Sequence, residues 1–98
     1  VIGQLRVSRE NRAVHWRGQE IAMNSAEFKL FAILADAAGK VMSRNDILVK
    51  MRGIEFDGLD RSIDNCISRL RRKFDDAAAE RIKTVWGEGY LLTPSAWE

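Results

Sequence analysis

A short stretch in the second half of the chain concentrates side chains that bind polyanions. Residues 61–73 hold five cations and one anion, which is a local charge of +4 in a chain whose formal net charge is only +2. Acidic residues flank the stretch on both sides. This distribution indicates an oriented polyanion site rather than a uniformly basic surface. The cations are Arg61, Arg69, Arg71, Arg72 and Lys73, and the anion is Asp64.

Hydrophobic periodicity places these side chains on a helix over residues 60–74. At about 100° per residue, Ile63, Ile67, Leu70 and Phe74 form one narrow apolar stripe, which is typical of a helix face packed against a core. Arginine, asparagine and serine can hydrogen-bond to base edges, and the major groove of DNA, about 12 Å wide, accepts a helix. A basic helix face without further support is more often simply solvated. The polar face carries Arg61, Ser62, Asn65, Ser68, Arg69 and Arg72, with Arg71 and Lys73 on its shoulders.

Elements on both sides must hold this helix in place. Residues 1–23 alternate apolar and polar side chains in three short runs separated by two turn sequences, which predicts an antiparallel sheet. Two further helices are predicted between this sheet and the basic helix, so that residues 24–74 form a three-helix core. The first is expected to end at a left-handed C-cap on Gly39, and the second to run through Met51 to Gly53. Their capping pairs are Asn24 with Glu27 and Ser43 with Asp46.

A β-hairpin is predicted over residues 81–92. Residues 81–85 and 90–92 have strand composition, and Trp86-Gly87-Glu88-Gly89 between them is a loop containing two glycines. Three helices, the third basic on its outer face, followed by a hairpin with a flexible tip, resemble a winged helix, so the fold class expected is α+β, a winged helix-turn-helix.

Four sequence motifs stand in order along the chain. They are Asn24-x-x-Glu27-Phe28-x-Leu30-Phe31, Ser43-Arg44-x-x-Ile47-Leu48, the basic helix from Arg61 to Lys73, and Thr84-Val85-x-Gly87-x-Gly89-Tyr90. Together they resemble the C-terminal DNA-binding, or effector, domains of OmpR/PhoB-type response regulators, and the resemblance covers essentially all 98 residues. Residues 52–60 and 94–98 further resemble the RstA branch of that family.

The resemblance implies a fold and a way of binding DNA. It implies one domain over residues 1–98, with an N-terminal antiparallel β-sheet, a three-helix core and a C-terminal β-hairpin wing. The third helix is expected in the major groove and the wing, residues 84–90, near the adjacent minor groove. Base reading is implied for Ser62, Asn65 and Arg69, with Arg69 suited to a bidentate contact with guanine.

Other positions are expected to hold phosphates, which sets the register on DNA without reading sequence. Asn24 belongs with them because the N-terminus of a helix attracts anions. The expected phosphate contacts are Asn24, Arg61, Ser68, Arg71, Arg72, Lys73 and Thr84.

The wing departs from the family pattern. Many members have an arginine between the positions of Val85 and Gly87 that enters the minor groove, whereas this chain has Trp86 there, with Glu88 and Gly89 in the same turn. An indole cannot replace the attraction of a guanidinium to a narrow, electronegative groove. We therefore expect Trp86 either to pack on sugar edges or to pack against its own domain.

The resemblance also implies protein partners. The loop with Ile54, Glu55, Phe56 and Asp57 corresponds to the segment by which relatives approach RNA polymerase. The chain begins at Val1 rather than Met, and we expect it to be a piece of a longer protein whose N-terminal receiver domain is absent here. A sensor kinase is expected to phosphorylate that receiver in a two-component phosphorelay. Dimerisation then places two effector domains on direct-repeat half-sites about one helical turn apart.

Other classes of function are disfavoured by composition. A single Cys66 and a single His15 provide neither a disulfide nor a zinc site, and they fall on different predicted elements, so no catalytic residue, metal or cofactor is expected. We expect Cys66 at the margin of the groove, Asp64 in a structural ion pair or hydrogen bond, and Trp97 in a tail without a role. No apolar run approaches the roughly 20 residues of a membrane span, and a cytoplasmic location without a membrane partner is expected. The expected core aromatics are Trp16, Phe28, Phe31 and Phe74.

One alternative function remains open. A winged helix can also serve as a protein-docking module without specific DNA readout, with its basic helix against an acidic partner.

Overall fold

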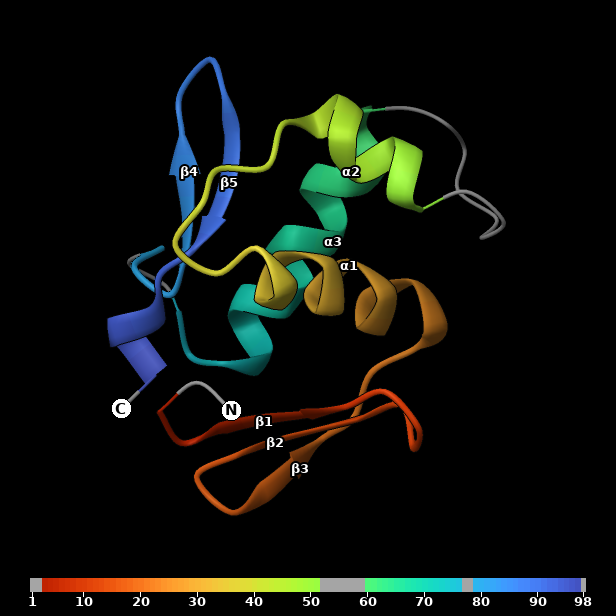
Figure 1. Ribbon diagram of the computed structural model, residues 1–98, viewed down its shortest axis with the longest axis vertical. Helices are drawn as coiled ribbons and strands as arrows, with labels where there is room; N and C mark the ends of the chain where they lie inside the picture. Colours follow the sequence, from red (N-terminus) through yellow and green to blue (C-terminus); the bar gives the residue numbers. More distant parts are fainter. Residues whose placement is uncertain (1–2, 52–59, 77–78, 98) are drawn as a thin grey trace.

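The computed structural model describes residues 3–51, 60–76 and 79–97, with residues 60–62 described for their backbone alone. A three-stranded sheet lies below three helices, and a hairpin rises at the far end (Figure 1). This arrangement confirms the predicted winged-helix fold class. In chain order the elements are β1 (Leu5–Ser8), β2 (Ala13–Trp16), β3 (Gln19–Ile21), α1 (Ser25–Asp36), α2 (Arg44–Lys50), α3 (Asp60–Lys73), β4 (Ile82–Val85), β5 (Gly89–Leu92) and a 3₁₀ helix (Pro94–Trp97).

The N-terminal sheet is an antiparallel meander in the order β1-β2-β3, as the alternation of side chains predicts. Leu5 of β1 pairs with Trp16 of β2, and Val14 of β2 pairs with Ile21 of β3. Leu5, Val14 and Trp16 are buried, so one face of the sheet belongs to the core. The sheet thus supports the helices from the side away from the hairpin.

Helix α1 begins at the predicted capping box. The Asn24 side chain accepts a hydrogen bond from the Glu27 N–H at 2.8 Å, and Glu27 Oε1 accepts one from the Asn24 N–H at 3.0 Å. The predicted C-cap on Gly39 is wrong, because the helix ends at Asp36 and Ala37 is its C-cap. Gly39 does adopt a left-handed conformation, with φ of +85°, but it does so in the turn that follows.

Helix α2 is short and begins where its cap was predicted. Ser43 Oγ accepts a hydrogen bond from the Asp46 N–H at 3.0 Å. The helix ends at Lys50 with Met51 as its C-cap, and Gly53, where the sequence places the end, lies outside the described residues.

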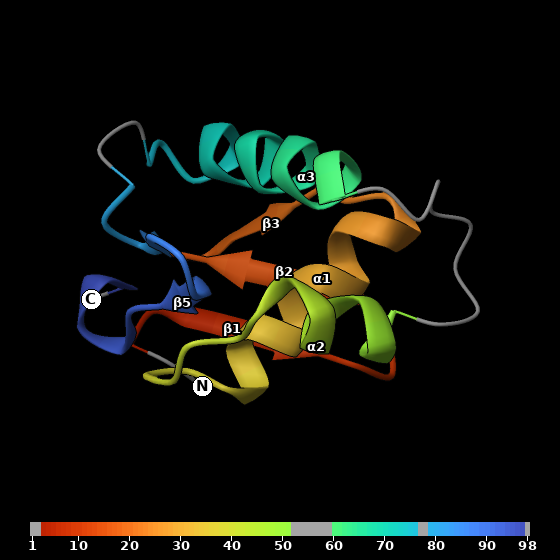
Figure 2. The ribbon, with the colours of Figure 1, turned by 90° about the horizontal axis from the view of Figure 1, so that it is seen from above.

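Helix α3 forms one outer edge of the domain, which the view from above shows clearly (Figure 2). Its predicted apolar stripe, from Ile63 to Phe74, is buried in the core. Cys66 is buried as well, so its expected place at the groove margin is wrong. The residue lies at the edge of the stripe on the helical wheel, and α3 packs against α1.

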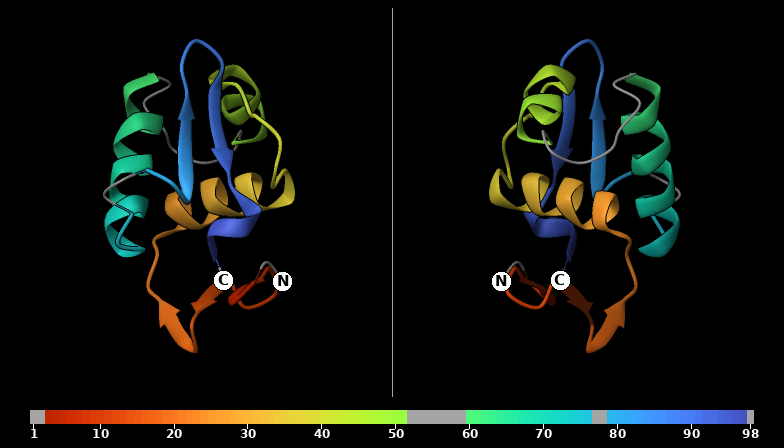
Figure 3. Two further views of the ribbon diagram at one scale, coloured as in Figure 1. Left: turned by 90° about the vertical axis from the view of Figure 1, so that its left-hand side faces the viewer. Right: turned by 90° about the vertical axis from the view of Figure 1, so that its right-hand side faces the viewer.

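The hairpin of β4 and β5 is the wing, and its tip extends beyond the helices at the end opposite the N-terminal sheet (Figure 3). Met42, just before α2, exchanges two backbone hydrogen bonds with Tyr90 of β5, at 2.8 and 2.9 Å. Gly89 makes this close approach possible, because a Cβ atom there would lie 2.0 Å from the Met42 carbonyl oxygen. The segment before α2 therefore fixes the base of the wing.

The C-terminal 3₁₀ helix closes the core. Trp97 is fully buried and packs edge-on against Phe74, with ring centroids 4.9 Å apart, and against Phe31 at 5.7 Å. Its carbonyl oxygen accepts a hydrogen bond from the Gln4 N–H at 2.9 Å, which joins the end of the chain to its beginning. The expectation of a tail residue without a role is wrong for Trp97. The predicted core aromatics Trp16, Phe28, Phe31 and Phe74 are confirmed.

Among the described helices, none combines the length and apolar character needed to span a membrane.

Candidate nucleic-acid interface

The polar face of α3 is open to solvent from Asn65 to Arg72. Asn65, Ser68, Arg69 and Arg72 are exposed, whereas the apolar stripe on the opposite side is buried. Arg61 and Ser62 are part of the helix, but their side chains lie outside the described set. The helix thus presents hydrogen-bond donors and positive charge outward while it is anchored inward.

Arg69, the expected reader of guanine, is held by a buried carboxylate on α1. Its Nε donates a hydrogen bond to Glu27 Oε2 at 3.1 Å. The Glu27 side chain is 5% exposed, while the Arg69 side chain is 48% exposed. This bond uses Nε and leaves the two terminal Nη groups outside the Glu27 contact. The guanidinium is therefore held along one edge by Glu27.

Glu27 also binds Lys73, the last residue of α3. Lys73 Nζ lies 3.4 Å from Glu27 Oε1 and donates a hydrogen bond to the Ala22 carbonyl at 2.6 Å. Burial alone raises the pKa of the Glu27 carboxyl, but the Asn24 N–H, Lys73 and Arg69 together bring that pKa below its ordinary value. Glu27 is therefore ionised at neutral pH and connects the start of α1 to two cations of α3.

Arg71 connects α3 to the wing. Its Nε and Nη2 donate hydrogen bonds to the Ile82 carbonyl at 2.9 and 2.7 Å, and Nη2 also donates to Thr84 Oγ1 at 2.8 Å. Arg71 and Thr84 are both expected phosphate contacts, and the structure brings them together on the side where α3 faces β4. The same guanidinium therefore sets the position of the wing strand relative to α3.

A second cluster joins α2, α3 and the wing. Asp64 accepts hydrogen bonds from Arg44 Nε and Nη2 at 3.2 and 3.1 Å and from the Tyr90 hydroxyl. Two guanidinium groups lie near the Tyr90 ring: that of Arg44 is 5.6 Å from the ring centroid and that of Arg71 is 5.9 Å from it. Burial, followed by the Asp64 carboxylate, raises the pKa of the Tyr90 hydroxyl. The structural role expected of Asp64 is confirmed.

Arg44 and Tyr90 also belong to this cluster, and the sequence analysis did not identify either of them as a site residue. Both stand in the family motifs, but neither has a local pattern that indicates a partner. The hydrogen bond from Tyr90 spans 26 positions of the chain and those from Arg44 span 20. Such contacts depend on how the elements pack.

A cleft of about 470 Å³ opens beside the C-terminal half of α3. The residues that line it are Ser68, Arg71, Arg72, Asp75 and Asp76. The Asp76 carboxylate is occupied by the backbone N–H groups of residues 80, 81 and 82, each at 2.9 Å. Three expected phosphate contacts therefore share one concave surface beside the C-terminal half of α3.

The wing tip presents a large apolar side chain to solvent. Trp86 is 89% exposed, so the expectation that it packs against its own domain is wrong. Gly87 follows it with φ of +78° in the turn, and Glu88 is exposed beside it. The indole is therefore available to an external partner.

The remaining expected site residues are Asn24 and the residues of the polymerase-contact loop. Asn24 is exposed at the N-terminus of α1, where its side-chain oxygen already accepts the Glu27 N–H. The expected polymerase-contact residues Ile54, Glu55, Phe56 and Asp57 lie outside the described residues. In the described part of the chain, no three His, Cys, Asp or Glu residues lie close enough to hold a metal ion.

Comparison with known proteins places this geometry in a family. Residues 18–92 match the family model described as "Transcriptional regulatory protein, C terminal". The chain is 49% identical over 98 residues to the transcriptional regulatory protein RstA of Escherichia coli (strain K12), an alignment that covers 98% of this chain and 41% of that protein. The chain thus spans about 41% of the length of this curated relative.

Solved structures give the same result. The crystal structure of the Klebsiella pneumoniae RstA DNA-binding domain in complex with the RstA box has a TM-score of 0.84 and 44% identity, covering 96% of this chain and 95% of that one. The solution structure of the C-terminal effector domain of BfmR from Acinetobacter baumannii has a TM-score of 0.78 and 43% identity, covering 96% and 88%. The chain therefore belongs to the C-terminal family of transcriptional regulatory proteins, as an RstA-type effector domain of the OmpR/PhoB response regulators.

Proposed function

We propose that this domain binds specific double-stranded DNA sequences and thereby controls transcription as the output domain of a two-component response regulator. The observation that carries the proposal is the two-sided character of α3, with its apolar stripe in the core and its Asn65, Ser68, Arg69 and Arg72 side chains in solvent. A solvent-facing helix with these side chains fits the major groove. Support also comes from the relative from Klebsiella pneumoniae, whose solved structure is a complex with the RstA box.

Base reading is assigned to Ser62, Asn65 and Arg69. Arg69 Nε donates a hydrogen bond to Glu27 Oε2 at 3.1 Å, so we assign the two terminal Nη groups to the base contact. Two parallel donors match the O6 and N7 acceptors of guanine in the major groove. Loss of such a contact costs about 1–3 kcal/mol of discrimination at one base pair.

Phosphate contacts position the domain on the duplex. Arg72 is exposed on α3, and Ser68 and Arg71 share the cleft beside it. If four to six phosphates are neutralised, the logarithm of the affinity falls against the logarithm of salt concentration with a slope of about −4 to −5. The full set assigned to phosphates is Asn24, Arg61, Ser68, Arg71, Arg72, Lys73 and Thr84.

The wing is assigned to the adjacent minor groove, where Trp86 meets sugar edges by apolar contact. Its 89% exposure supports this role. Gly87 and Gly89 shape the turn that presents it. Since the indole is uncharged, this contact adds area without adding to the salt dependence.

The remaining partners belong to the longer protein. The loop with Ile54, Glu55, Phe56 and Asp57 is assigned to RNA polymerase, so that a Phe56→Ala change reduces transcription and leaves promoter binding intact. A sensor kinase acts through the receiver domain, and two effector domains bind direct-repeat sites as a dimer on DNA. The domain acts in the cytoplasm and is a binding module rather than an enzyme.

The test is selection of a preferred sequence from a random duplex pool, followed by titration of that sequence and a scrambled one at several salt concentrations. Arg69→Ala is expected to lower the preference at one base pair by about fivefold or more. Arg12→Ala is the matched control, because Arg12 is exposed in the turn between β1 and β2. Specific and scrambled DNA binding equally well, with a flat salt response, would refute the proposal and favour a protein-docking module.

A further inference from the structure

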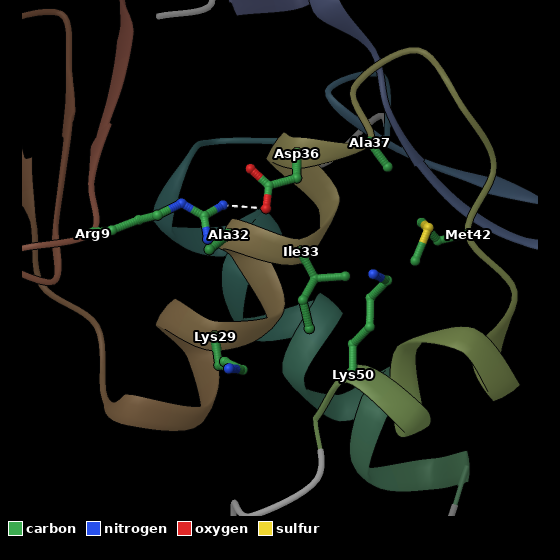
Figure 4. A pocket seen from close by; sticks show the side chains of 8 residues that line it. All are labelled: Arg9, Lys29, Ala32, Ile33, Asp36, Ala37, Met42 and Lys50. Atoms are coloured by element: carbon green, nitrogen blue, oxygen red, sulfur yellow. Dashed lines mark ion pairs between the residues drawn. The ribbon is translucent and has the colours of Figure 1, made fainter.

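A second binding surface lies on the side of α1 that faces away from α3. A pocket of about 430 Å³ is bounded by the turn after β1, by α1 and by the end of α2 (Figure 4). Lys29 and Asp36, which line it, lie roughly 180–200° around the helix from Glu27, the residue that binds α3. A ligand in this pocket therefore leaves the basic face of α3 free. The lining residues are Arg9, Lys29, Ala32, Ile33, Asp36, Ala37, Met42 and Lys50.

The pocket combines an apolar floor with a cationic rim. Ala32 and Ile33 are buried in the floor, and Met42 borders it. Three cations stand around this floor with a single anion, Asp36, which Arg9 already binds in an ion pair (Figure 4). Within the described residues, Lys29 and Lys50 form no ion pair. Two ammonium groups that form no ion pair with the described residues therefore border an apolar surface.

Two exposed apolar residues are sequence neighbours of residues that line the pocket. Only three large hydrophobic residues are exposed in the described part of the chain, and one of them is Trp86 at the wing tip. The other two, Val41 at 41% and Val49 at 50% exposure, are the sequence neighbours of the lining residues Met42 and Lys50. Exposed apolar area with a polar rim is typical of an interaction site.

We propose that this pocket binds an acidic peptide segment of a partner protein, with one apolar side chain of that segment on the floor and Asp or Glu residues beside it against Lys29 and Lys50. Charge complementarity supports this occupant, since opposite charges around an apolar contact provide both orientation and exclusion of wrong partners. A nucleic-acid backbone offers the negative charges but no aliphatic group for the floor formed by Ala32, Ile33 and Met42. A small inorganic anion likewise leaves the apolar surface unused.

The geometry makes this site independent of the proposed DNA contact. The pocket and the exposed face of α3 lie on opposite sides of α1, and they share no residue. The domain can therefore hold DNA and a partner at the same time. For a regulator of transcription, such a site joins a DNA-bound domain to a second protein.

The experiment measures fluorescence anisotropy of labelled peptides with the intact 98-residue chain. The probe is a peptide with a Leu-Phe pair between two Asp-Glu pairs, and peptides of the same composition class are drawn from a random phage library on the same target. One control peptide has Ser-Ser in place of Leu-Phe, and a second has Lys in place of every acid. The probe is expected to bind saturably, and each control peptide is expected to bind at least tenfold more weakly.

The site is mapped by a double charge reversal, Lys29→Glu with Lys50→Glu. This variant is expected to bind the probe at least tenfold more weakly and to keep its affinity for the selected DNA, because neither lysine belongs to the DNA interface. Lys40→Glu with Lys83→Glu is the matched control for net charge, since both residues are exposed and neither lines the pocket. Thermal unfolding of both variants checks that they are folded.

Three results would overturn this proposal. The first is that neither the probe nor any acidic, apolar library peptide binds. The second is an equal loss of probe binding in the pocket variant and its charge-matched control. The third is displacement of the probe by a scrambled duplex, together with loss of duplex binding in the pocket variant, which identifies the surface as a nucleic-acid contact. None of these results bears on sequence preference measured with Arg69→Ala, so failure of the two proposals is distinguishable.

Discussion

Replacing Glu27 by glutamine tests whether a buried carboxylate holds the base-reading arginine in place. Glutamine keeps an acceptor for the Asn24 N–H, 3.0 Å from Oε1 in the native structure, and removes the charge that binds Arg69 and Lys73. Each of these cation contacts is screened, since Arg69 is about half exposed and Lys73 is partly so. Each contact then contributes about 0.5–1 kcal/mol, and the variant is expected to lose about 1–2 kcal/mol of unfolding free energy at pH 7.

The sign of the pH dependence follows from the direction of the pKa shift. The pKa of Glu27 is lowered from its ordinary value of 4.5 in the folded state. Its stabilising contribution is therefore complete above the unfolded-state pKa and is lost as the pH falls through the folded-state pKa. The difference in stability between native chain and Glu27→Gln is expected to be constant from pH 7 to about pH 5 and to shrink below that value. Urea denaturation at several pH values measures it.

The same variant affects DNA recognition. An untethered Arg69 must be ordered on binding, which costs about 0.5–1.5 kcal/mol, or about two- to twelvefold in affinity for the preferred base pair. Glu10→Gln is the matched control, because Glu10 is an exposed carboxylate in the turn after β1. Unchanged base preference in Glu27→Gln, alongside a clear loss in Arg69→Ala, would refute the positioning role. Unchanged stability at pH 7 would refute the energetic assignment.

Three further predictions concern the wing and the core. Trp86→Arg is expected to tighten DNA binding and to steepen the salt dependence of the affinity by about 1 in slope, because it adds a cation at the exposed wing tip. A salt titration measures both effects. An unchanged or weaker affinity would count against an electrostatic role for the wing. Gly89→Ala is expected to cost more than about 3 kcal/mol in urea denaturation, because the new Cβ would lie 2.0 Å from the Met42 carbonyl oxygen. Gly18→Ala, with φ of +79° and nothing within 4 Å of the new Cβ, is its control and is expected to cost only about 1–2 kcal/mol, so equal losses in the two variants would contradict the steric explanation. Burial raises the pKa of the Cys66 thiol to about 11, so at pH 8 its reaction with a disulfide reagent is expected to be slow in the native chain and fast in urea; rapid native labelling would contradict its burial.

Much of the fold could be predicted because its signals are local. The caps at Asn24 and Ser43 act within one helical turn, and the apolar stripe of α3 repeats every three to four residues. The sequence predicts the C-cap of α1 at Gly39, two residues after the observed C-cap, Ala37. The two alanines before Gly39 are compatible with either a helix or the turn that they form. Residue type alone does not distinguish these two backbone conformations.

The candidate site was predictable as a face, but its internal contacts were not. The polar side of α3 follows from periodicity, and Asn65, Ser68 and Arg72 are exposed as that pattern predicts. The DNA roles of all these side chains stay predictions. The bond between Arg69 and Glu27 joins residues 42 positions apart, and no local spacing indicates it. Which cations are tethered and which are free depends on the packing of α1 and β4 against α3.

The sequence alone predicts the family resemblance, the order of the elements, and which side of the third helix is apolar and which is charged. Each of these predictions comes from motifs or periodicities among residues a few positions apart. The burial of Trp97 and Cys66, the grip of Glu27 on two cations, and the pocket ringed by Lys29 and Lys50 emerged only on folding. The reason is physical: the burial of a side chain and the partner of a charge are set by whatever packs over them, and those groups come from distant parts of the chain.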